Sequence, residues 1–291
     1  MHFPRKRILT HRGLEPSRRN FYPESSYEAF EDHLSRGFGI EFDPNFVKDG
    51  VVVSHDYNTK RITHGRIDKN FADMNVDEIS NIRYGTDLVG RLAMLDEILK
   101  LIRKYDPPAC AMHVKGGYQN SINMDILAEH LKRYQDIVPH LVLFDLKPEF
   151  SRRLRRSISG LNTAPSVAHP YDIERYNAAT KNTLYTAEQA LELKDCFNWV
   201  WLDEWDTANK SGKKRLYTQE TFSTLRDAGY KIALVTPELH ASSPGLLGGE
   251  AHEDARDKET LFKRIREILL LKPDAVCTDY PEEVAGFELP D

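Results

Sequence analysis

The sequence contains little cysteine, no long apolar run and no excess of positive charge. Its three cysteines, Cys110, Cys196 and Cys277, lie far apart and include no Cys-x-x-Cys pair, so they predict neither a disulfide framework nor a structural zinc site. No stretch approaches the roughly 18 apolar residues of a membrane span, and the first residues lack the apolar core of a signal peptide. These absences predict a cytoplasmic protein without stable membrane insertion.

The charge is nearly balanced, with 40 Lys and Arg against 45 Asp and Glu and a formal net charge of −5. Nucleic-acid binding depends on a basic surface, so no nucleic-acid partner is expected. A chain of 291 residues with 40% hydrophobic side chains can bury a substantial core. We therefore expect a globular protein that acts on a small molecule or a lipid headgroup.

Short apolar runs alternate with helical patterns along the chain. The candidate strands are residues 8–10, 39–43, 51–55, 110–114, 141–144, 166–168, 199–202, 231–235 and 275–278. Several of them lack polar alternation, which is typical of parallel strands covered on both faces. The run 51–55 follows 39–43 through the turn Lys48-Asp49-Gly50, so it is expected to form a hairpin. The other eight strand–helix units predict a single (β/α)8 TIM barrel over residues 1–291, an α/β fold with a small hairpin insertion after the second strand.

Apolar residues at helical spacing lie between the strands. Leu95, Ile98, Leu99 and Ile102 repeat at i, i+3, i+4 and i+7, as on the buried face of a helix. The one long irregular segment is 237–254, which follows the seventh barrel strand. A barrel of this kind places its active-site loops at that end of the strands.

Two histidines follow or end early strands. His11 and Arg12 come at the end of the first candidate strand. A proton carrier therefore lies beside a guanidinium, whose forked shape suits a phosphate. His55 ends the expected hairpin, which returns it toward the same end of the barrel. The two imidazoles are therefore a candidate base and acid on opposite sides of a phosphorus centre.

Two carboxylates lie two positions apart on the second strand. Glu41 and Asp43 point to the same side, because residues i and i+2 of a strand share a face. They would repel each other unless a cation lay between them, and oxygen ligands favour Mg²⁺ or Ca²⁺. The alternative is a partly solvated strand end paired with lysine or arginine.

Together these motifs resemble the glycerophosphodiester phosphodiesterase family of TIM barrels. The resemblance rests on His11-Arg12-Gly13, Pro23-Glu24, Tyr27-Glu28-Ala29-Phe30, Glu41-x-Asp43, Lys48-Asp49-Gly50, His55-Asp56 and Thr278-Asp279-Tyr280-Pro281. The ordered motifs over residues 11–56 are specific, the last one is moderately so, and the middle of the chain matches only in layout.

The resemblance implies a metal-dependent enzyme that hydrolyses a small glycerophosphodiester-like substrate to an alcohol and a phosphomonoester. One divalent metal is held by the Glu-x-Asp carboxylates and by a third ligand on the next barrel strand. The positions that carry over are Glu41 and Asp43 for the metal, His11 and His55 for general base and acid, and Arg12 and Lys115 for the substrate phosphate.

The sequence departs from the family at the third metal ligand, where His113 replaces a glutamate. A neutral imidazole can ligate a metal, but it removes one negative charge and moves the preference from Mg²⁺ toward Mn²⁺, Fe²⁺ or Zn²⁺. Either His113 holds a different or weaker metal, or Glu15, Asp203 or Glu204 completes the shell.

A second departure lies on the seventh strand. The tryptophan-bearing motif of the family reads Leu234-Val235-Thr236-Pro237 in this chain, so the substrate-facing aromatic is missing there. Trp201 or Trp205, from the sixth strand, is the expected replacement.

Two alternatives stay open. The same barrel would act as a lyase or transferase if a hydroxyl of a lipid or sugar phosphodiester attacked internally and gave a cyclic phosphate. It would be a non-catalytic phospho-ligand-binding barrel if His113 had abolished metal binding. The presence of both carboxylates and both histidines favours an enzyme.

Overall fold

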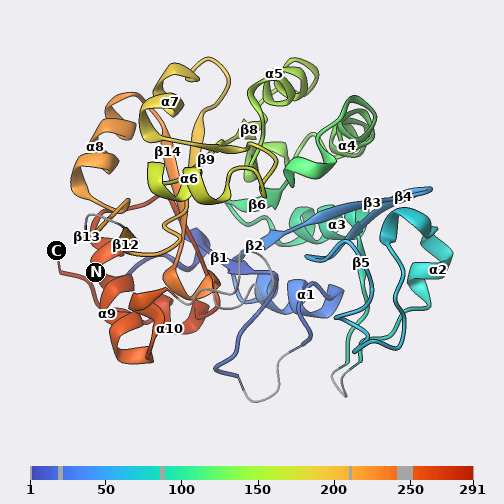
Figure 1. Cartoon of the computed structure of the whole chain (residues 1–291). Coiled ribbons are helices and arrows are strands. Elements are labelled where there is room, and N and C mark those ends of the chain that lie inside the picture. The colour runs from blue at the N-terminus through green and yellow to red at the C-terminus, as the bar shows by residue number, and fades with distance from the viewer. Residues whose placement is uncertain (1, 19–21, 86–88, 210–211, 241–251, 291) are drawn as a thin grey trace.

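A curled parallel sheet with helices around it forms the centre of the molecule (Figure 1). The computed structural model describes residues 2–18, 22–85, 89–209, 212–240 and 252–290. The long strands of the sheet are β1 (Ile8–His11), β2 (Gly39–Phe42), β6 (Cys110–His113), β7 (Leu141–Phe144), β11 (Trp199–Leu202), β14 (Lys231–Val235) and β15 (Ala275–Thr278). They pair in the order β11-β14-β15-β1-β2-β6-β7, and every pair is parallel.

The sheet closes into a ring through residues 162–167. In this segment β8 (Asn162–Thr163) pairs in parallel with β7, and β9 (Ser166–Val167) pairs in parallel with β11. Pro165 lies at the break between β8 and β9, as expected for a residue that has no N–H to give to a strand ladder. A further short strand, β10 (Leu184–Tyr185), pairs with β9. The eight-stranded α/β barrel predicted from the sequence is therefore confirmed.

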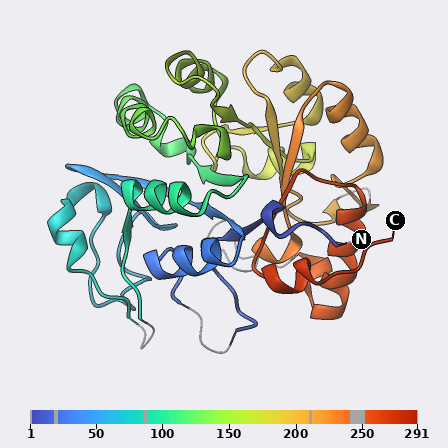
Figure 2. The same ribbon diagram turned by 180° about the vertical axis from the view of Figure 1, so that it is seen from behind.

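The helices cover the outside of this ring, as both views show (Figures 1 and 2). They are α1 (Tyr27–Ser35), α3 (Leu95–Tyr105), α4 (Ser121–Arg133), α5 (Pro148–Ser157), α6 (Pro170–Tyr176), α7 (Ala187–Glu192), α8 (Gln219–Asp227), α9 (Lys258–Leu270) and α10 (Pro281–Ala285). Local signals set their ends: the Ser26 hydroxyl accepts the Ala29 N–H at the start of α1, and Gly37 follows its last turn with φ +84°. None of the helices in the described ranges is long and apolar enough to cross a membrane.

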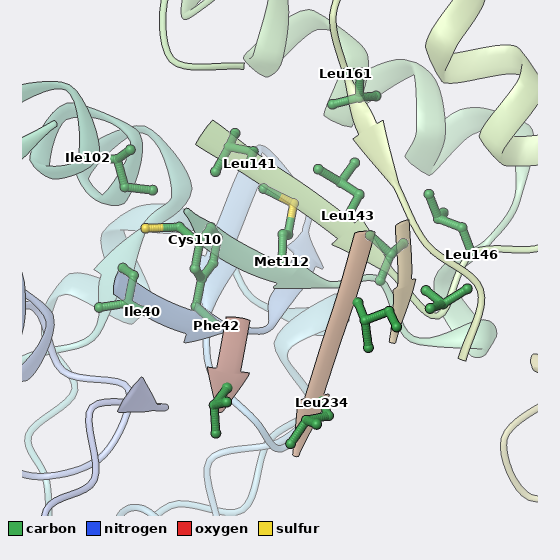
Figure 3. Close-up of a cluster of buried hydrophobic side chains, with 14 of the residues drawn as sticks. Ile40, Phe42, Ile102, Cys110, Met112, Leu141, Leu143, Leu146, Leu161 and Leu234 are labelled. Atoms are coloured by element: carbon green, nitrogen blue, oxygen red, sulfur yellow. The ribbon is translucent and has the colours of Figure 1, made fainter. Parts of the chain in front are cut away.

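Alternation along the strands separates two apolar layers. The outer layer packs between the sheet and the helices and includes Ile40 and Phe42 of β2, Cys110 and Met112 of β6, and Leu141 and Leu143 of β7 (Figure 3). The inner layer fills the barrel and contains Leu9, Ala111, Val142, Phe144, Trp201, Ala233 and Cys277. Because neighbouring residues of a strand face opposite sides, burying Phe42 and Met112 outward directs Glu41 and His113 into the barrel.

A small antiparallel sheet follows the second barrel strand. It consists of β3 (Pro44–Val47), β4 (Gly50–Val53) and β5 (Ala93–Met94), with Val47 opposite Gly50 at the turn. The expected pairing of 51–55 with 39–43 differs from this arrangement, because the partner of β4 is a separate strand that begins at Pro44. Residues between β4 and β5, including α2 (Val76–Ser80), bury their own apolar cluster, so the insertion is larger than a hairpin.

The first and last described segments lie side by side at one edge of the molecule (Figures 1 and 2), where His2 and Glu288 form an antiparallel bridge. The irregular segment expected at 237–254 begins with a short 3-10 helix, Pro237–His240, and ends near another, Glu253–Ala255. Its middle, 241–251, lies outside the described residues.

Candidate active site

The residues singled out in the sequence meet inside the barrel at the carboxyl ends of β1, β2 and β6. His11 is in register with Glu41, and Glu41 is in register with Ala111, two residues before His113. A cavity of about 130 Å³ opens between them. The expected site residues that line it are His11, Arg12, Glu41, Asp43, His55 and His113.

Two buried carboxylates form one side of this cavity. Glu41 and Asp43 are 3% and 1% exposed, and each can offer an oxygen within 4.8 Å of a ring nitrogen of His113. Among the described residues, Glu41 Oε2 and Asp43 Oδ2 are buried without a hydrogen-bond partner. Burial, and then the charge of Asp43, raises the pKa of Glu41. Orphaned carboxylate oxygens of this kind are the donor set that a divalent cation requires, so the residues fit a metal.

His113 lies between two carboxylates. Its Nδ1 is 3.0 Å from Asp43 Oδ1, and its Nε2 is 3.4 Å from Asp145 Oδ2. Burial lowers the pKa of His113, but the contacts with Asp145 and Asp43 outweigh it and raise the pKa to about 9. Asp145 was missed in the sequence. The only feature that could have indicated it is its position directly after the candidate strand 141–144.

Both proposed proton carriers have a carboxylate on Nδ1. His11 Nδ1 lies 2.9 Å from Asp279 Oδ1, and His55 Nδ1 lies 2.9 Å from Asp56 Oδ1. Arg61 holds Asp56 in turn, with Nε donating to Oδ2 at 2.6 Å. A carboxylate in this position fixes the tautomer, with the proton on Nδ1 and the lone pair on Nε2. Burial, and then the charges of Arg12 and Lys115, lowers the pKa of His55 to about 4.

Two cations flank Asp43. Arg12 Nε lies 3.9 Å from Asp43 Oδ2, and Lys115 Nζ lies 3.1 Å from Asp43 Oδ1 and also donates to the carbonyl oxygen of His55. Arg12 lines the cavity, whereas Lys115 is directed at Asp43 beside it.

The turn that presents Arg12 requires a glycine after it. Gly13 has φ +71°, and a Cβ at this position would lie 2.8 Å from the Cβ of Ala29 in α1. A larger residue would therefore be strained and would push the turn away from the helix.

Glu238 supports the site from the 3-10 helix that follows β14, and it was also missed in the sequence. Its Oε1 accepts the hydroxyls of Thr236 and Thr278, both at 2.6 Å, and the backbone N–H of Asp279 at 3.0 Å. Burial, and then the charge of Asp279, raises the pKa of Glu238 to about 7. Glu238 directly follows Leu234-Val235-Thr236-Pro237, the segment that replaces the tryptophan motif. It holds the backbone N–H of Asp279, the residue that pairs with His11.

The opposite wall of the cavity is aromatic. The Phe144 ring stacks on Trp201 with centroids 3.8 Å apart, and Trp205 lies 5.1 Å from Tyr176. Trp201 and Trp205 both line the cavity, as expected for the replacement of the missing tryptophan. Asp203 lines it as well.

Glu15 and Glu204 do not join the site. Glu15 pairs with Arg36 at 2.6 Å, on the outer side of the barrel near α1. Glu204 accepts the backbone N–H of Tyr217 at 3.1 Å and lies 3.3 Å from Arg215. Neither carboxylate lines the cavity, so the structure does not bring Glu15 or Glu204 to Glu41 and Asp43.

The comparison with known proteins agrees with this arrangement. The sequence profile of the glycerophosphoryl diester phosphodiesterase family matches residues 11–283. None of the curated proteins matches the chain.

Solved structures share the fold at low sequence identity. A candidate glycerophosphoryl diester phosphodiesterase from Agrobacterium tumefaciens is 16% identical, with 96% of this chain and 95% of that chain covered and a TM-score of 0.65. A glycerophosphoryl diester phosphodiesterase from Parabacteroides distasonis is 18% identical, with 98% and 87% covered and a TM-score of 0.62. A phosphodiesterase from Oleispira antarctica, solved with the product sn-glycerol-3-phosphate, is 16% identical, with 96% and 94% covered and a TM-score of 0.62.

These structures establish the fold, and the profile match spans the motifs from His11 to beyond Asp279. The chain therefore belongs to the glycerophosphoryl diester phosphodiesterase family, whose members are phosphoric diester hydrolases.

Proposed function

We propose that this chain is a metal-dependent phosphodiesterase that hydrolyses a small glycerophosphodiester-like substrate to an alcohol and a phosphomonoester. The observation that carries the proposal is the meeting, at one cavity, of two carboxylate-paired histidines and two buried carboxylate oxygens that accept no hydrogen bond from the described residues. A pair of proton carriers beside a metal site is what phosphodiester hydrolysis requires, which supports the proposal.

Glu41, Asp43 and His113 would hold one divalent metal ion, since their donor atoms lie within 4.8 Å of one another. When bound, the metal supplies Lewis-acid stabilisation of the charge that builds on the phosphoryl oxygens. The mixed oxygen and nitrogen set suits Mn²⁺ or Zn²⁺ as well as the Mg²⁺ or Ca²⁺ expected of the family.

The two histidines transfer the protons. One of His11 and His55 takes the proton of the attacking hydroxyl through Nε2, and the other gives a proton to the departing alkoxide. Asp279 and Asp56 stabilise whichever ring is positively charged. Arg12 and Lys115 add fixed positive charge for the phosphate beside Asp43.

A small substrate agrees with the size of the cavity, about 130 Å³. The Oleispira antarctica phosphodiesterase was solved with sn-glycerol-3-phosphate, which is the phosphomonoester that a glycerophosphodiester would give here. The three cysteines are free and buried, which suits the cytoplasmic location predicted from the sequence, and we propose that residues 1–291 act as one domain.

The proposal is tested by hydrolysis of glycerophosphodiesters after removal of metal with a chelator and its replacement by Mg²⁺, Ca²⁺, Mn²⁺ or Zn²⁺. Turnover should depend on added metal and be lost in Glu41→Ala. His55→Ala should bind metal normally but turn over about 10²- to 10⁴-fold more slowly. Phosphorus NMR of the products separates hydrolysis from cyclisation, because a lyase releases a cyclic phosphate. Near-normal turnover in His55→Ala would contradict the assignment.

A further inference from the structure

Asp145 is a buried carboxylate beside the proposed metal site that no motif accounts for. It directly follows Phe144, the last residue of β7, is 5% exposed and lines the same cavity as Glu41. Within the described ranges of the chain, no lysine or arginine pairs with it, and its ion-pair partner is Nε2 of His113 at 3.4 Å. A buried carboxylate with a single imidazole partner needs an explanation, because burying an uncompensated charge is costly.

We propose that Asp145 is a positioning residue that makes His113 a metal ligand. With a metal bound, Asp145 would keep the proton on Nε2, which lies 3.4 Å from its carboxylate, and Nδ1, which lies 3.0 Å from Asp43 Oδ1, would be the ligating nitrogen. Metal-bound histidines commonly give their second N–H to a carboxylate, which fixes the tautomer and makes the ligating nitrogen more basic. The inference rests on the proposed metal dependence and names the residue that makes it possible without a third carboxylate ligand.

The charge of the site supports this role. A shell of Glu41, Asp43 and a neutral imidazole carries two negative charges, whereas a shell of three carboxylates carries three. Asp145 restores the third negative charge from behind His113, so it would not itself be a ligand. The histidine therefore replaces the glutamate of the family without reducing the total negative charge around the ion.

The local structure holds Asp145 in place. Its backbone adopts φ +65°, a left-handed conformation that aspartate tolerates better than most residues. Gln119 Nε2 donates to the carbonyl oxygens of Asp145 at 2.7 Å and of Val114 at 2.8 Å. One amide thus joins the segment after β7 to the residue that follows His113, so the two side chains cannot drift apart.

The ring of His113 is held on its face as well. It stacks on Phe144 with centroids 4.6 Å apart and an interplanar angle of 9°, and Phe144 stacks in turn on Trp201. With the ring plane set by Phe144 and one edge set by Asp145, the remaining edge faces Asp43. A histidine on a solvated strand end would have neither restraint.

The test is calorimetric titration of Mn²⁺ and Zn²⁺ into four metal-stripped proteins: wild type, Asp145→Asn, His113→Glu and the double variant. Asp145→Asn preserves the volume of the side chain but removes its charge. We expect it to weaken metal binding about 10- to 100-fold in the wild-type background. In the His113→Glu background the carboxylate of Asp145 would repel the new glutamate, so removing its charge should leave metal affinity unchanged or increase it.

The reversal between backgrounds separates positioning from a structural role, since a general loss of packing would weaken binding equally in both. Circular dichroism and the thermal midpoint report whether each variant is folded. Undiminished affinity in Asp145→Asn, or an equal loss in both backgrounds, would overturn the inference while leaving metal dependence intact. Failure of the wild type to bind either ion would instead overturn the proposed function together with the inference.

Discussion

His11 and Asp279 lie 2.9 Å apart although 268 positions separate them in the sequence. The contact exists because β1 and β15 are neighbours in the barrel, with Thr10 in register with Thr278. Glu238 accepts the backbone N–H of Asp279 from the other side. The strands β1 and β15 and the segment after β14 therefore hold His11 beside its carboxylate partner, as the proposed proton transfer requires.

Asp279→Asn should slow turnover strongly. The amide cannot stabilise a positively charged His11 and can also select the wrong tautomer, so we expect a decrease in kcat of up to about 10⁴-fold. Steady-state kinetics on a glycerophosphodiester measures the effect, and unchanged metal affinity provides the control. Wild-type kcat in this variant would show that His11 does not carry a proton.

Lys115→Met should separate phosphate binding from metal binding. The lysine is a second cation at Asp43, so its removal should leave the metal dissociation constant unchanged or lower. Loss of one charge-assisted contact to the phosphate should reduce kcat/KM roughly 10- to 150-fold. Weaker metal binding in this variant would instead make Lys115 a structural support of Asp43.

Trp205→Ala should change the preference for the alcohol group. Trp205 belongs to the aromatic wall of the cavity, together with Trp201 and Tyr176. We expect kcat/KM for a diester with a bulky apolar alcohol to fall about tenfold, with a smaller change for one with a short polar alcohol. Each substrate serves as the control for the other. An equal loss of kcat/KM for both would mean that the alcohol group does not bind against Trp205.

Glu15 should contribute to stability in a pH-dependent way. Burial opposes its ionisation, but hydrogen bonds from His33 and Arg36 prevail and lower its pKa from 4.5 to about 2. A group whose pKa is lower in the folded state stabilises the fold above its unfolded pKa and loses this effect as the pH falls toward the folded value. We expect the contribution, on the order of 3 kcal/mol, to disappear between about pH 5 and pH 2.

Urea unfolding of wild type and Glu15→Gln at pH 6 and pH 3 measures this contribution. The free energy of unfolding should fall less with acid in the variant than in the wild type. Some acid sensitivity should persist, because hydrogen bonding from His252 and the charge of Arg264 overcome the burial of Glu204 and lower its pKa to about 2 as well. Parallel losses in the two proteins would contradict the assignment.

The sequence predicts those features that depend on neighbours along the chain. Strand alternation brings Glu41 and Asp43 to one face, and apolar spacing identifies the buried side of α3. The size of the insertion was underestimated, because the strand Pro44–Val47 begins directly after β2 and contains no separating turn signal.

Asp145 and Glu238 could not be found in this way. The carboxylate of Asp145 reaches His113 through a left-handed residue and through the pairing of β6 with β7, and neither is visible as a local pattern. Glu238 acts on a backbone N–H some forty positions away, which is meaningful only once β14 and β15 are adjacent. Conversely, Glu15 and Glu204 have the right chemistry but lie beside arginines of other elements.

The pairing of β1 with β15 also has a consequence for biosynthesis. A ribosome makes His11 268 residues before Asp279, so a growing chain that ends before Asp279 contains only one member of this pair. Long-range closure of this kind is slow compared with local helix formation. The pairing of β1 with β15 should therefore form late, and a chain that terminates before β15 should be inactive although it contains Glu41, Asp43 and His113.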